Sequence, residues 1–300
     1  MPNLRSLVKR RKAIRNIRKI TKTMELIATA RFKKALDRAV EADAYTRKIA
    51  ELAADLSGSA GDVSHPLLAA RPTTKKVLVL VLTANRGLCG GYNGGILREA
   101  ASQLRTLRAD GTPFDLEVSG KRGMQYFKFQ QVPTSAFYTH FEEKPKFEEV
   151  DALASKFIDL YVSGQVDKLI VVYQKFQSIS RQFPVAEVLL PLSSVSLETT
   201  KKPSGPQPDA IVGPKSDYDF FPDAAGILNE LVPVAFKVRL FKCFLDAAVG
   251  EQIARRVAMK AATENAGDLI KEVSRLYNRT RQANITREIS ELIAGSEALK

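Results

Sequence analysis

The fold of this chain is decided by residues 250–300, GEQIARRVAMKAATENAGDLIKEVSRLYNRTRQANITREISELIAGSEALK. This stretch contains no proline, and its apolar residues recur at the spacing of one helical face. A single helix of this length extends for roughly 75 Å, which is more than a compact domain needs. We therefore expect one long helix with a partner lying along it. Its apolar positions are Ile253, Val257, Ala261, Leu269, Val273, Leu276, Ile285, Ile289 and Leu292.

A second long helix is expected at the other end of the chain, from Leu4 to about Leu56, because this segment contains neither glycine nor proline. Its apolar stripe narrows to alanine toward the middle, which would let a partner helix approach closely. The stripe consists of Leu7, Ile14, Ile17, Met24, Ile27, Ala28, Ala35, Ala39 and Ala42.

The start of this second helix is strongly basic. Nine Lys or Arg residues lie between Arg5 and Lys22, and no acidic residue precedes Glu25. Like charges one turn apart destabilise an isolated helix by about 0.2–0.5 kcal/mol per pair. Together with the formal net charge of +13, this cost implies an anionic partner, which could be nucleic acid, anionic lipid or an acidic protein surface. Charge alone does not choose among them.

Between the two helices the hydrophobic period changes to that of strands. The run KKVLVLVL at 75–82 is typical of a strand buried on both faces, and it leads into a glycine-rich turn at 85–95. Strand and helix patterns then alternate, which predicts an α/β domain with a largely parallel sheet. Prolines place the last strand at an edge. The further strands are expected at 114–120, 133–141, 167–176 and 183–192.

Two terminal helices with one apolar stripe each most simply bury those stripes against each other, antiparallel because both meet the same inserted domain. Successive apolar residues are separated by three or four positions, as in a left-handed coiled coil, although no strict heptad repeat continues from end to end. Pro233 should kink or restart the last helix. The tip of that helix should project and, being apolar, be enclosed by other subunits. The expected segments are an N-terminal coiled-coil helix (1–57), an α/β domain (72–196), a linker (197–221) and a C-terminal coiled-coil helix (222–300).

No catalytic constellation is found. The glycine-rich turn lacks both G-x-G-x-x-G and the lysine of a P-loop, so we interpret it as a structural turn. His65 and His140 are isolated, and Cys89 and Cys243 fit no metal or disulfide pattern, which favours a reducing compartment. We therefore expect no cofactor, no metal and no small-molecule substrate. Two other classes stay open: a basic coiled-coil protein that binds nucleic acid, which lacks a recognised module here, and an enzyme with an unrecognised α/β site.

Three stretches resemble the gamma subunit of F-type ATP synthases of the bacterial type. They are IRKITKTMELIATARFKKA (17–35), NRGLCGGYNGG (85–95) and RRVAMKAATENAGDLIKEVSRLYNRTRQANITREISELIAG (255–295). The resemblance implies an antiparallel coiled coil of the terminal helices with an inserted Rossmann-like α/β domain. It also implies a non-catalytic rotor in the central stalk, turned by a proton-driven ring of membrane c subunits inside a catalytic hexamer of alpha and beta subunits.

The resemblance further implies contacts with the epsilon subunit and the c ring, and a peripheral location on the cytoplasmic face of the bacterial inner membrane. It assigns Met24 and Arg255 to the region facing the lever loops of the beta subunits. The chain departs from the family pattern at Asn85, Gly250 and Arg256, the last of which leaves the lever-loop contact open. The loops that catch the shaft would bind Arg281, Gln282, Thr286 and Glu288, and the c ring would contact Tyr45 and Tyr218.

Overall fold

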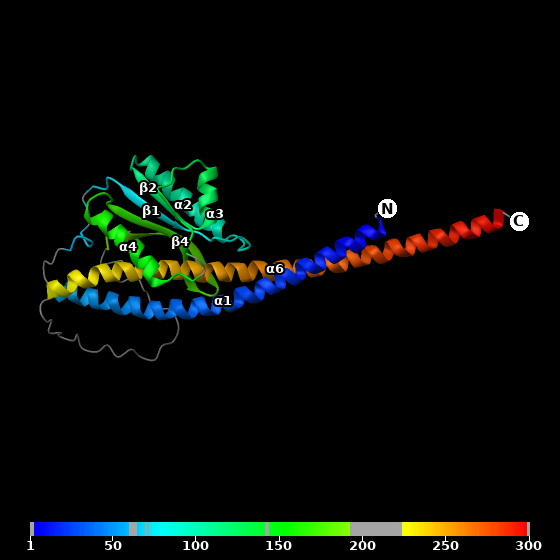
Figure 1. Cartoon of the computed structure of the whole chain (residues 1–300), viewed down its shortest axis with the longest axis horizontal. Helices are drawn as coiled ribbons and strands as arrows, with labels where there is room; N and C mark the ends of the chain where they lie inside the picture. The colour runs from blue at the N-terminus through cyan, green and yellow to red at the C-terminus, as the bar shows by residue number, and fades with distance from the viewer. Residues whose placement is uncertain are drawn as a thin grey trace. The chain divides into compact units, whose positions relative to one another are not determined.

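The structure is a computed structural model, and it describes residues 3–59, 65–69, 71, 73–141, 144–192 and 224–298. The chain begins with α1, Leu4–Ser59, and ends with α6, Ala224–Ala298, so the two long terminal helices are confirmed (Figure 1). Strands and helices alternate between them. These are β1 (Val77–Leu82), α2 (Tyr92–Ala109), β2 (Phe114–Ser119), α3 (Lys121–Phe129), β3 (Ala136–Tyr138), α4 (Phe147–Val162), β4 (Lys168–Ser178) and β5 (Arg181–Leu190).

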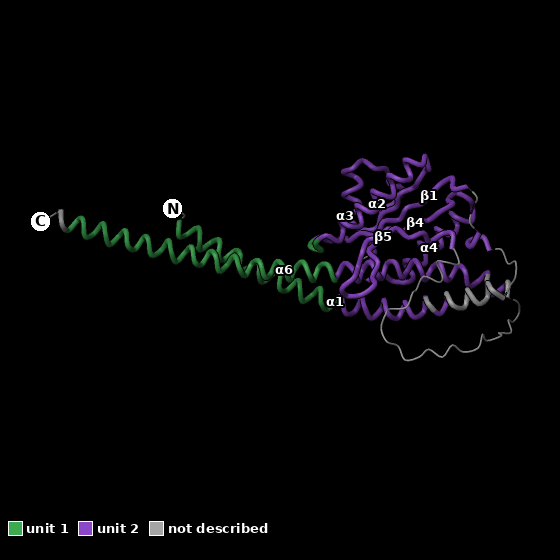
Figure 2. Tube along the Cα trace, turned by 180° about the vertical axis from the view of Figure 1, so that it is seen from behind, with its two compact units in different colours: residues 1–31, 88–90, 253–300 green, residues 32–87, 91–252 purple. Residues whose placement is uncertain are grey.

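The chain divides into two compact units that do not follow chain order (Figure 2). The helical unit comprises Met1–Arg31, Leu88–Gly90 and Ile253–Lys300, and the sheet unit comprises Phe32–Gly87 and Gly91–Gln252. The long helices α1 and α6 therefore each contribute to both units. The four segments predicted from the sequence follow chain order instead, and their boundaries stay a prediction.

The sheet unit contains one five-stranded sheet in the order β3-β2-β1-β4-β5. Strands β1, β2, β3 and β4 are parallel neighbours, and β5 is antiparallel to β4. All six residues of β1 are buried, as expected for a central strand covered on both faces. The largely parallel sheet is confirmed, and so is the edge position of the proline-containing strand, because β5 ends the strand order.

The first part of α6 belongs to the core of the sheet unit. Phe236 and Leu240 pack in one buried cluster with Leu80 of β1, Leu169 of β4 and Phe157 of α4. The helix continues through Pro233 without a break. Of the two predicted outcomes, a kink or a restart, the restart is therefore wrong. The reason is tertiary packing: Val232 and Phe236, on either side of the proline, are both anchored in this core, and such burial outweighs the roughly 3 kcal/mol that an internal proline costs.

In the helical unit, α1 and α6 pack antiparallel. Arg11 lies over the ring of Tyr277, whereas Thr21, further along α1, meets Thr263, which lies earlier in α6. Buried residues recur at seven-residue intervals in both helices. Seven residues make two turns of 3.5 residues each, which is the repeat of a left-handed coiled coil. The series is Leu7, Ile14, Thr21 and Ala28 in α1 and Met259, Ala266, Val273 and Thr280 in α6.

This repeat corrects the predicted apolar stripes. Ile17, Ile27 and Val257 were expected inside the helix pair, but they are exposed, as are Leu269 and Leu276. Each helix carries more apolar residues than one interface can bury, and close approach of the backbones favours the face that contains Ala28 and Ala266. The larger side chains therefore lie outside the pair.

The tip of α6, which we define as residues 281–298, extends beyond the start of α1 (Figure 2). From Arg281 to Ser296 every side chain is exposed except the partly buried Ala283 and Asn284. Leu292 is 74% exposed, and Ile285 and Ile289 are about half exposed. The predicted projecting apolar tip is therefore confirmed. No helix in the described ranges is long and apolar enough to cross a lipid bilayer.

Candidate interaction surface of the helical unit

The outer surface of α1 in the helical unit is basic. Of the nine Lys and Arg residues between Arg5 and Lys22, all are exposed except Arg11, which is partly buried over Tyr277 with 5.1 Å between its guanidinium carbon and the ring centroid. The positive charges thus face outward, while the seven-residue series faces α6. The basic side chains lie on a different face of α1 from the residues buried against α6. The charged face therefore stays exposed to solvent and suits an anionic partner.

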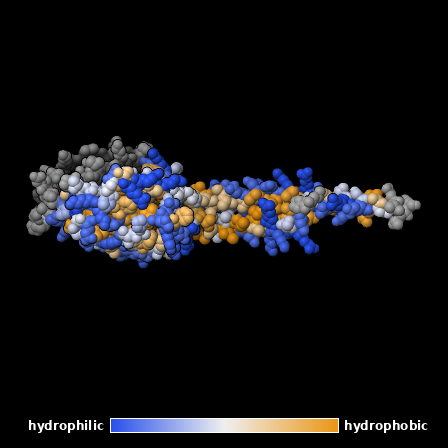
Figure 3. Space-filling model, turned by 90° about the horizontal axis from the view of Figure 1, so that it is seen from above, coloured by the Kyte–Doolittle hydropathy of each residue, from blue (hydrophilic) through white to orange (hydrophobic). Residues whose placement is uncertain are grey.

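A second apolar stripe lies on the outside of the same helix. Ile17, Ile20 and Ile27 are exposed and Met24 is partly buried. Their spacing of three and four residues places them on one helical face. Figure 3 shows hydrophobic side chains gathered on the visible face of the paired helices, with hydrophilic ones beside them. Exposed apolar residues that continue along one face are typical of a protein interface.

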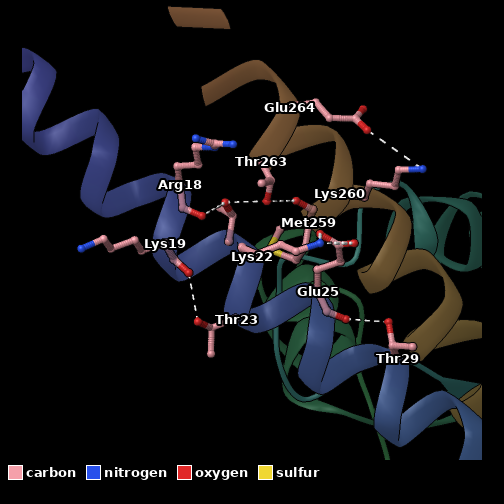
Figure 4. A network of polar contacts seen from close by, with 11 residues as sticks. Arg18, Lys19, Lys22, Thr23, Glu25, Thr29, Met259, Lys260, Thr263 and Glu264 are labelled. Atoms are coloured by element: carbon pink, nitrogen blue, oxygen red, sulfur yellow. Dashed lines mark hydrogen bonds and ion pairs between the residues drawn. The ribbon is translucent and has the colours of Figure 1, made fainter. Parts of the chain in front are cut away.

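Arg255 differs from Met24 in its surroundings. Its side chain is buried, at 8% exposure, whereas the neighbouring Arg256 is partly exposed and Val257 is exposed. Its position therefore reflects packing within the chain more than an outward-facing charge. Figure 4 shows the part of the helix pair that begins a few residues further along α6.

A polar layer joins the two helices in the middle of the coiled coil (Figure 4). The Thr263 hydroxyl lies 2.8 Å from the Thr21 hydroxyl and 2.8 Å from the Met259 carbonyl oxygen, and the Thr21 hydroxyl lies 3.1 Å from the carbonyl oxygen of Arg18. Whichever hydroxyl donates across the helices, the other can donate to its own helix carbonyl. Both hydroxyls are thus satisfied in a largely buried position.

The apolar spacing of the sequence does not reveal this layer, because threonine is not an apolar residue. Thr21 nevertheless stands seven residues from both Ile14 and Ala28, so a count of seven-residue intervals would have found it.

A double-mutant cycle measures the interaction energy between the two threonine hydroxyls of the layer. Thr21→Val and Thr263→Val keep the side-chain shape, and each leaves the remaining hydroxyl with its own helix carbonyl. We expect a coupling energy of about 0.5–1 kcal/mol, the net value of one hydrogen bond, in chemical denaturation of the full chain. Additive effects of the two substitutions would show that the two hydroxyls do not interact.

The predicted catch residues all lie on the tip. Arg281, Gln282, Thr286 and Glu288 are exposed, and no hydrogen bond or ion pair joins their side chains to other described residues. On a helix, Arg281 and Glu288 share a face with Ile285, and Gln282 and Thr286 share a face with Ile289. Ile285 and Ile289 are therefore each flanked by polar side chains that make no hydrogen bond or ion pair with other described residues.

Of the two tyrosines predicted to contact the c ring, the structure describes only Tyr45. Tyr45 is 57% exposed on α1, within the sheet unit. Tyr218 lies outside the residues that the structure describes. The c-ring prediction can therefore be placed on the structure for Tyr45 alone.

The glycine-rich turn leads from β1 to α2. Asn85 donates to the carbonyl oxygens of Thr139 and Phe141 and accepts from the backbone N–H of Lys121. Gly90 has a φ of +55°, which favours glycine, and a side chain there would contact Ala258 of α6 at 3.6 Å. These interactions give the turn a structural role.

A pocket lies at the carboxyl ends of β1 and β2, where dinucleotides bind in Rossmann folds. Here α6 contributes Phe244, Ala247 and Glu251 to its lining. The Thr83 hydroxyl, which also lines it, donates to the Ser119 carbonyl oxygen and accepts from the Gly123 N–H. Helix α6 thus forms one wall of this pocket. Among the described residues no group of three or more His, Cys, Asp and Glu side chains could hold a metal ion.

Comparison with known proteins identifies the family. A family model described as ATP synthase matches residues 3–299. The ATP synthase gamma chain of Rhodopirellula baltica is 50% identical over 300 residues and that of Leptospira biflexa serovar Patoc 38% over 299 residues, each with 100% of both chains covered. A chain in the OSCP/F1/c-ring structure of Euglena gracilis mitochondrial ATP synthase has the same fold, with a TM-score of 0.63 at 14% identity over 99% of this chain and 94% of that one. This chain belongs to the family of ATP synthase gamma chains.

Proposed function

We propose that this chain is the central-stalk rotor of an F-type ATP synthase and has no catalytic site of its own. The observation that carries the proposal is the tip of α6, an unpaired helix whose exposed apolar residues alternate with free polar groups. An apolar surface of this kind calls for enclosure by other subunits. A hexamer of alpha and beta subunits would supply that enclosure.

The helix pair would transmit rotation to the hexamer. Its basic and apolar outer faces differ, so each orientation presents a different surface to a given beta subunit. If one conformation of a beta subunit binds a given face of the helix pair more tightly, rotation shifts that subunit between conformations. The nucleotide affinity of the subunit then changes with its conformation. Because coupling between sites is reciprocal, ATP hydrolysis would drive the same rotation backward.

The proposed contacts divide between the two units. In the helical unit, Met24 and the exposed basic run would face acidic lever loops of the beta subunits, and buried Arg255 would support α6 behind that surface. Loops of the hexamer would catch the tip at Arg281, Gln282, Thr286 and Glu288. The sheet unit, with Tyr45, would meet the epsilon subunit and the membrane c ring. The chain would then act as a peripheral protein on the cytoplasmic face of a bacterial inner membrane.

Co-purification from the native membrane tests this proposal against nucleic-acid binding. With a tagged full-length chain, we expect an alpha–beta hexamer with ATPase activity, unaffected by nuclease treatment. A chain that purifies only with nucleic acid, and releases its partners after nuclease treatment, would refute the rotor function.

The basic surface gives a prediction about salt. The exposed charges between Arg5 and Lys22 should attract acidic loops through solvent, and raising the salt concentration from about 0.1 M to about 1 M shortens the screening length from roughly 10 Å to roughly 3 Å. The affinity of the full chain for the alpha–beta hexamer should therefore fall severalfold in a binding titration. An affinity independent of salt would show that apolar burial at the tip dominates instead.

A further inference from the structure

Asp246 of α6 is a buried carboxyl group that is incompletely hydrogen-bonded. Its side chain is 3% exposed, and its Oδ2 atom has no hydrogen-bond partner among the described residues. The carboxyl group accepts one hydrogen bond, from the backbone N–H of Phe176 in β4. A buried, ionised carboxylate with an unpartnered oxygen is costly, so the neutral form is favoured.

The surroundings of Asp246 come from four elements of the sheet unit. Lys242 lies one turn earlier on α6, on the same helical face, and it forms an ion pair with Asp43 of α1. This pair joins the two long helices. The other titratable or charged groups that act on Asp246 or share its cluster are Cys243 and Arg239 of α6, Tyr173 and Lys175 of β4 and Glu187 of β5.

The second acid of this cluster is fully satisfied. Glu187 accepts from Arg239 at 2.6 Å, from Tyr173 at 2.8 Å and from Lys175 at 3.1 Å. Burial alone would raise the pKa of Glu187, but the hydrogen bond from Arg239 and the charges of Lys175 and Arg239 outweigh it and lower the pKa to about 2. Glu187 therefore stays ionised and remains bound to Arg239 and Lys175.

Asp246 has no such set of partners. Burial raises the pKa of Asp246 to about 7, against the opposing effects of Lys242, the Phe176 N–H and Lys175, while Asp43 adds to the rise. Lys175 is bonded to Glu187, so the lysine within reach of Asp246 on its own helix face is Lys242. One ammonium group thus acts on two carboxyl groups: Lys242 is ion-paired with Asp43 of α1, and its charge opposes the rise in the pKa of Asp246 on α6.

We propose that Asp246 is a proton-controlled latch between α1 and α6. When Asp246 is neutral, Lys242 binds Asp43 and the two helices are joined. When Asp246 loses its proton, the new buried charge draws Lys242 away from Asp43, and the ion pair between the helices opens. The latch is a property of the chain by itself and goes beyond the proposed rotor function.

The latch makes stability depend on pH in a definite direction. The folded pKa of about 7 lies above the ordinary value of 3.8, so folding takes up a proton between these values. The stabilisation of the folded state by protonated Asp246 is fully present below about pH 4 and is lost as the pH rises through about 7. From pH 5 to pH 8 the resulting change in the unfolding equilibrium constant is roughly a hundredfold.

The test uses the full chain with Asp246→Asn, which holds the uncharged form, and with Asp268→Asn as a control on an exposed aspartate of the same helix. Unfolding by urea at pH 5 and at pH 8 should show the roughly hundredfold change in the wild type and in the Asp268 variant, but not in the Asp246 variant. Hydrogen exchange near Asp43, corrected for intrinsic rates, should accelerate with pH only where Asp246 is present.

Two results would overturn the latch. One is an Asp246→Asn variant with the pH profile of the wild type, and the other is exchange near Asp43 that is independent of pH. If the variant fails to fold, carboxyl ¹³C NMR of the wild type decides the question: titration of Asp246 near pH 7 supports the latch, and titration below pH 5 refutes it.

Discussion

Replacing Arg281 and Gln282 together with Ala should lower both assembly and coupled ATP synthesis by about tenfold or more. Both side chains are exposed on the tip and make no described contact within the chain. Hydrogen bonds to charged groups contribute about 1.5–3 kcal/mol, and about 1.4 kcal/mol corresponds to a factor of ten. The measurement is ATP synthesis by membrane vesicles, together with the amount of assembled complex.

The matched control replaces Arg275 and Asn278 with Ala. These residues are also exposed on α6, one to two turns earlier, where the helix is still paired with α1. We expect near wild-type synthesis from the control and unchanged folding of both isolated chains. Wild-type synthesis in the tip variant, or an equal loss in the control, would contradict a specific catch at the tip.

The second large effect is on stability. Phe236→Ala should destabilise the full chain by about 3–5 kcal/mol, because the ring is 0% exposed in the core between α6, α4 and the sheet. Val234→Ala is the control, because Val234 is 37% exposed on the same helix and should cost much less. Urea unfolding followed by circular dichroism measures both.

Equal, small effects of these two substitutions would show that this part of α6 does not belong to the core of the sheet unit. A large loss only for Phe236→Ala would also explain why α6 continues through Pro233. The helix would then be held by packing on both sides of the proline.

The main elements of the fold could be predicted from the sequence because each has a local signal. The absence of glycine and proline from Leu4 to Leu56 predicted α1, and the apolar run at 75–82 predicted the central strand. These two signals lie within single segments, so they do not depend on which segments meet. The antiparallel helix pair followed from the apolar stripe of each terminal helix and from the domain inserted between them.

The details that failed depend on contacts between segments. Ile17 and Val257 have the helical spacing of buried residues, but the helices pair through the faces that contain the small, buried side chains of Ala28 and Ala266. Pro233 breaks an isolated helix, yet the core around Phe236 holds α6 together. Local pattern cannot decide between two apolar faces of one helix.

The candidate site was predicted in part by the residues and in part by resemblance. The projecting tip followed from the difference in helix lengths, whereas the roles of Arg281, Gln282, Thr286 and Glu288 came from resemblance and remain proposals. The polar layer at Thr21 and the buried carboxyl of Asp246 were missed. The burial of Thr21 and of Asp246 is set by neighbours that are distant in sequence, including Thr263 for Thr21 and Phe176 for Asp246.

Rotation of the chain inside the alpha–beta hexamer tests the central claim most directly. A probe can be attached through Lys128→Cys, since Lys128 is exposed on α3 while the native Cys89 and Cys243 are buried. With the hexamer immobilised and ATP added, we expect continuous rotation of the probe in one direction. A hexamer that binds the chain and hydrolyses ATP while the probe shows only undirected motion would contradict the rotor function.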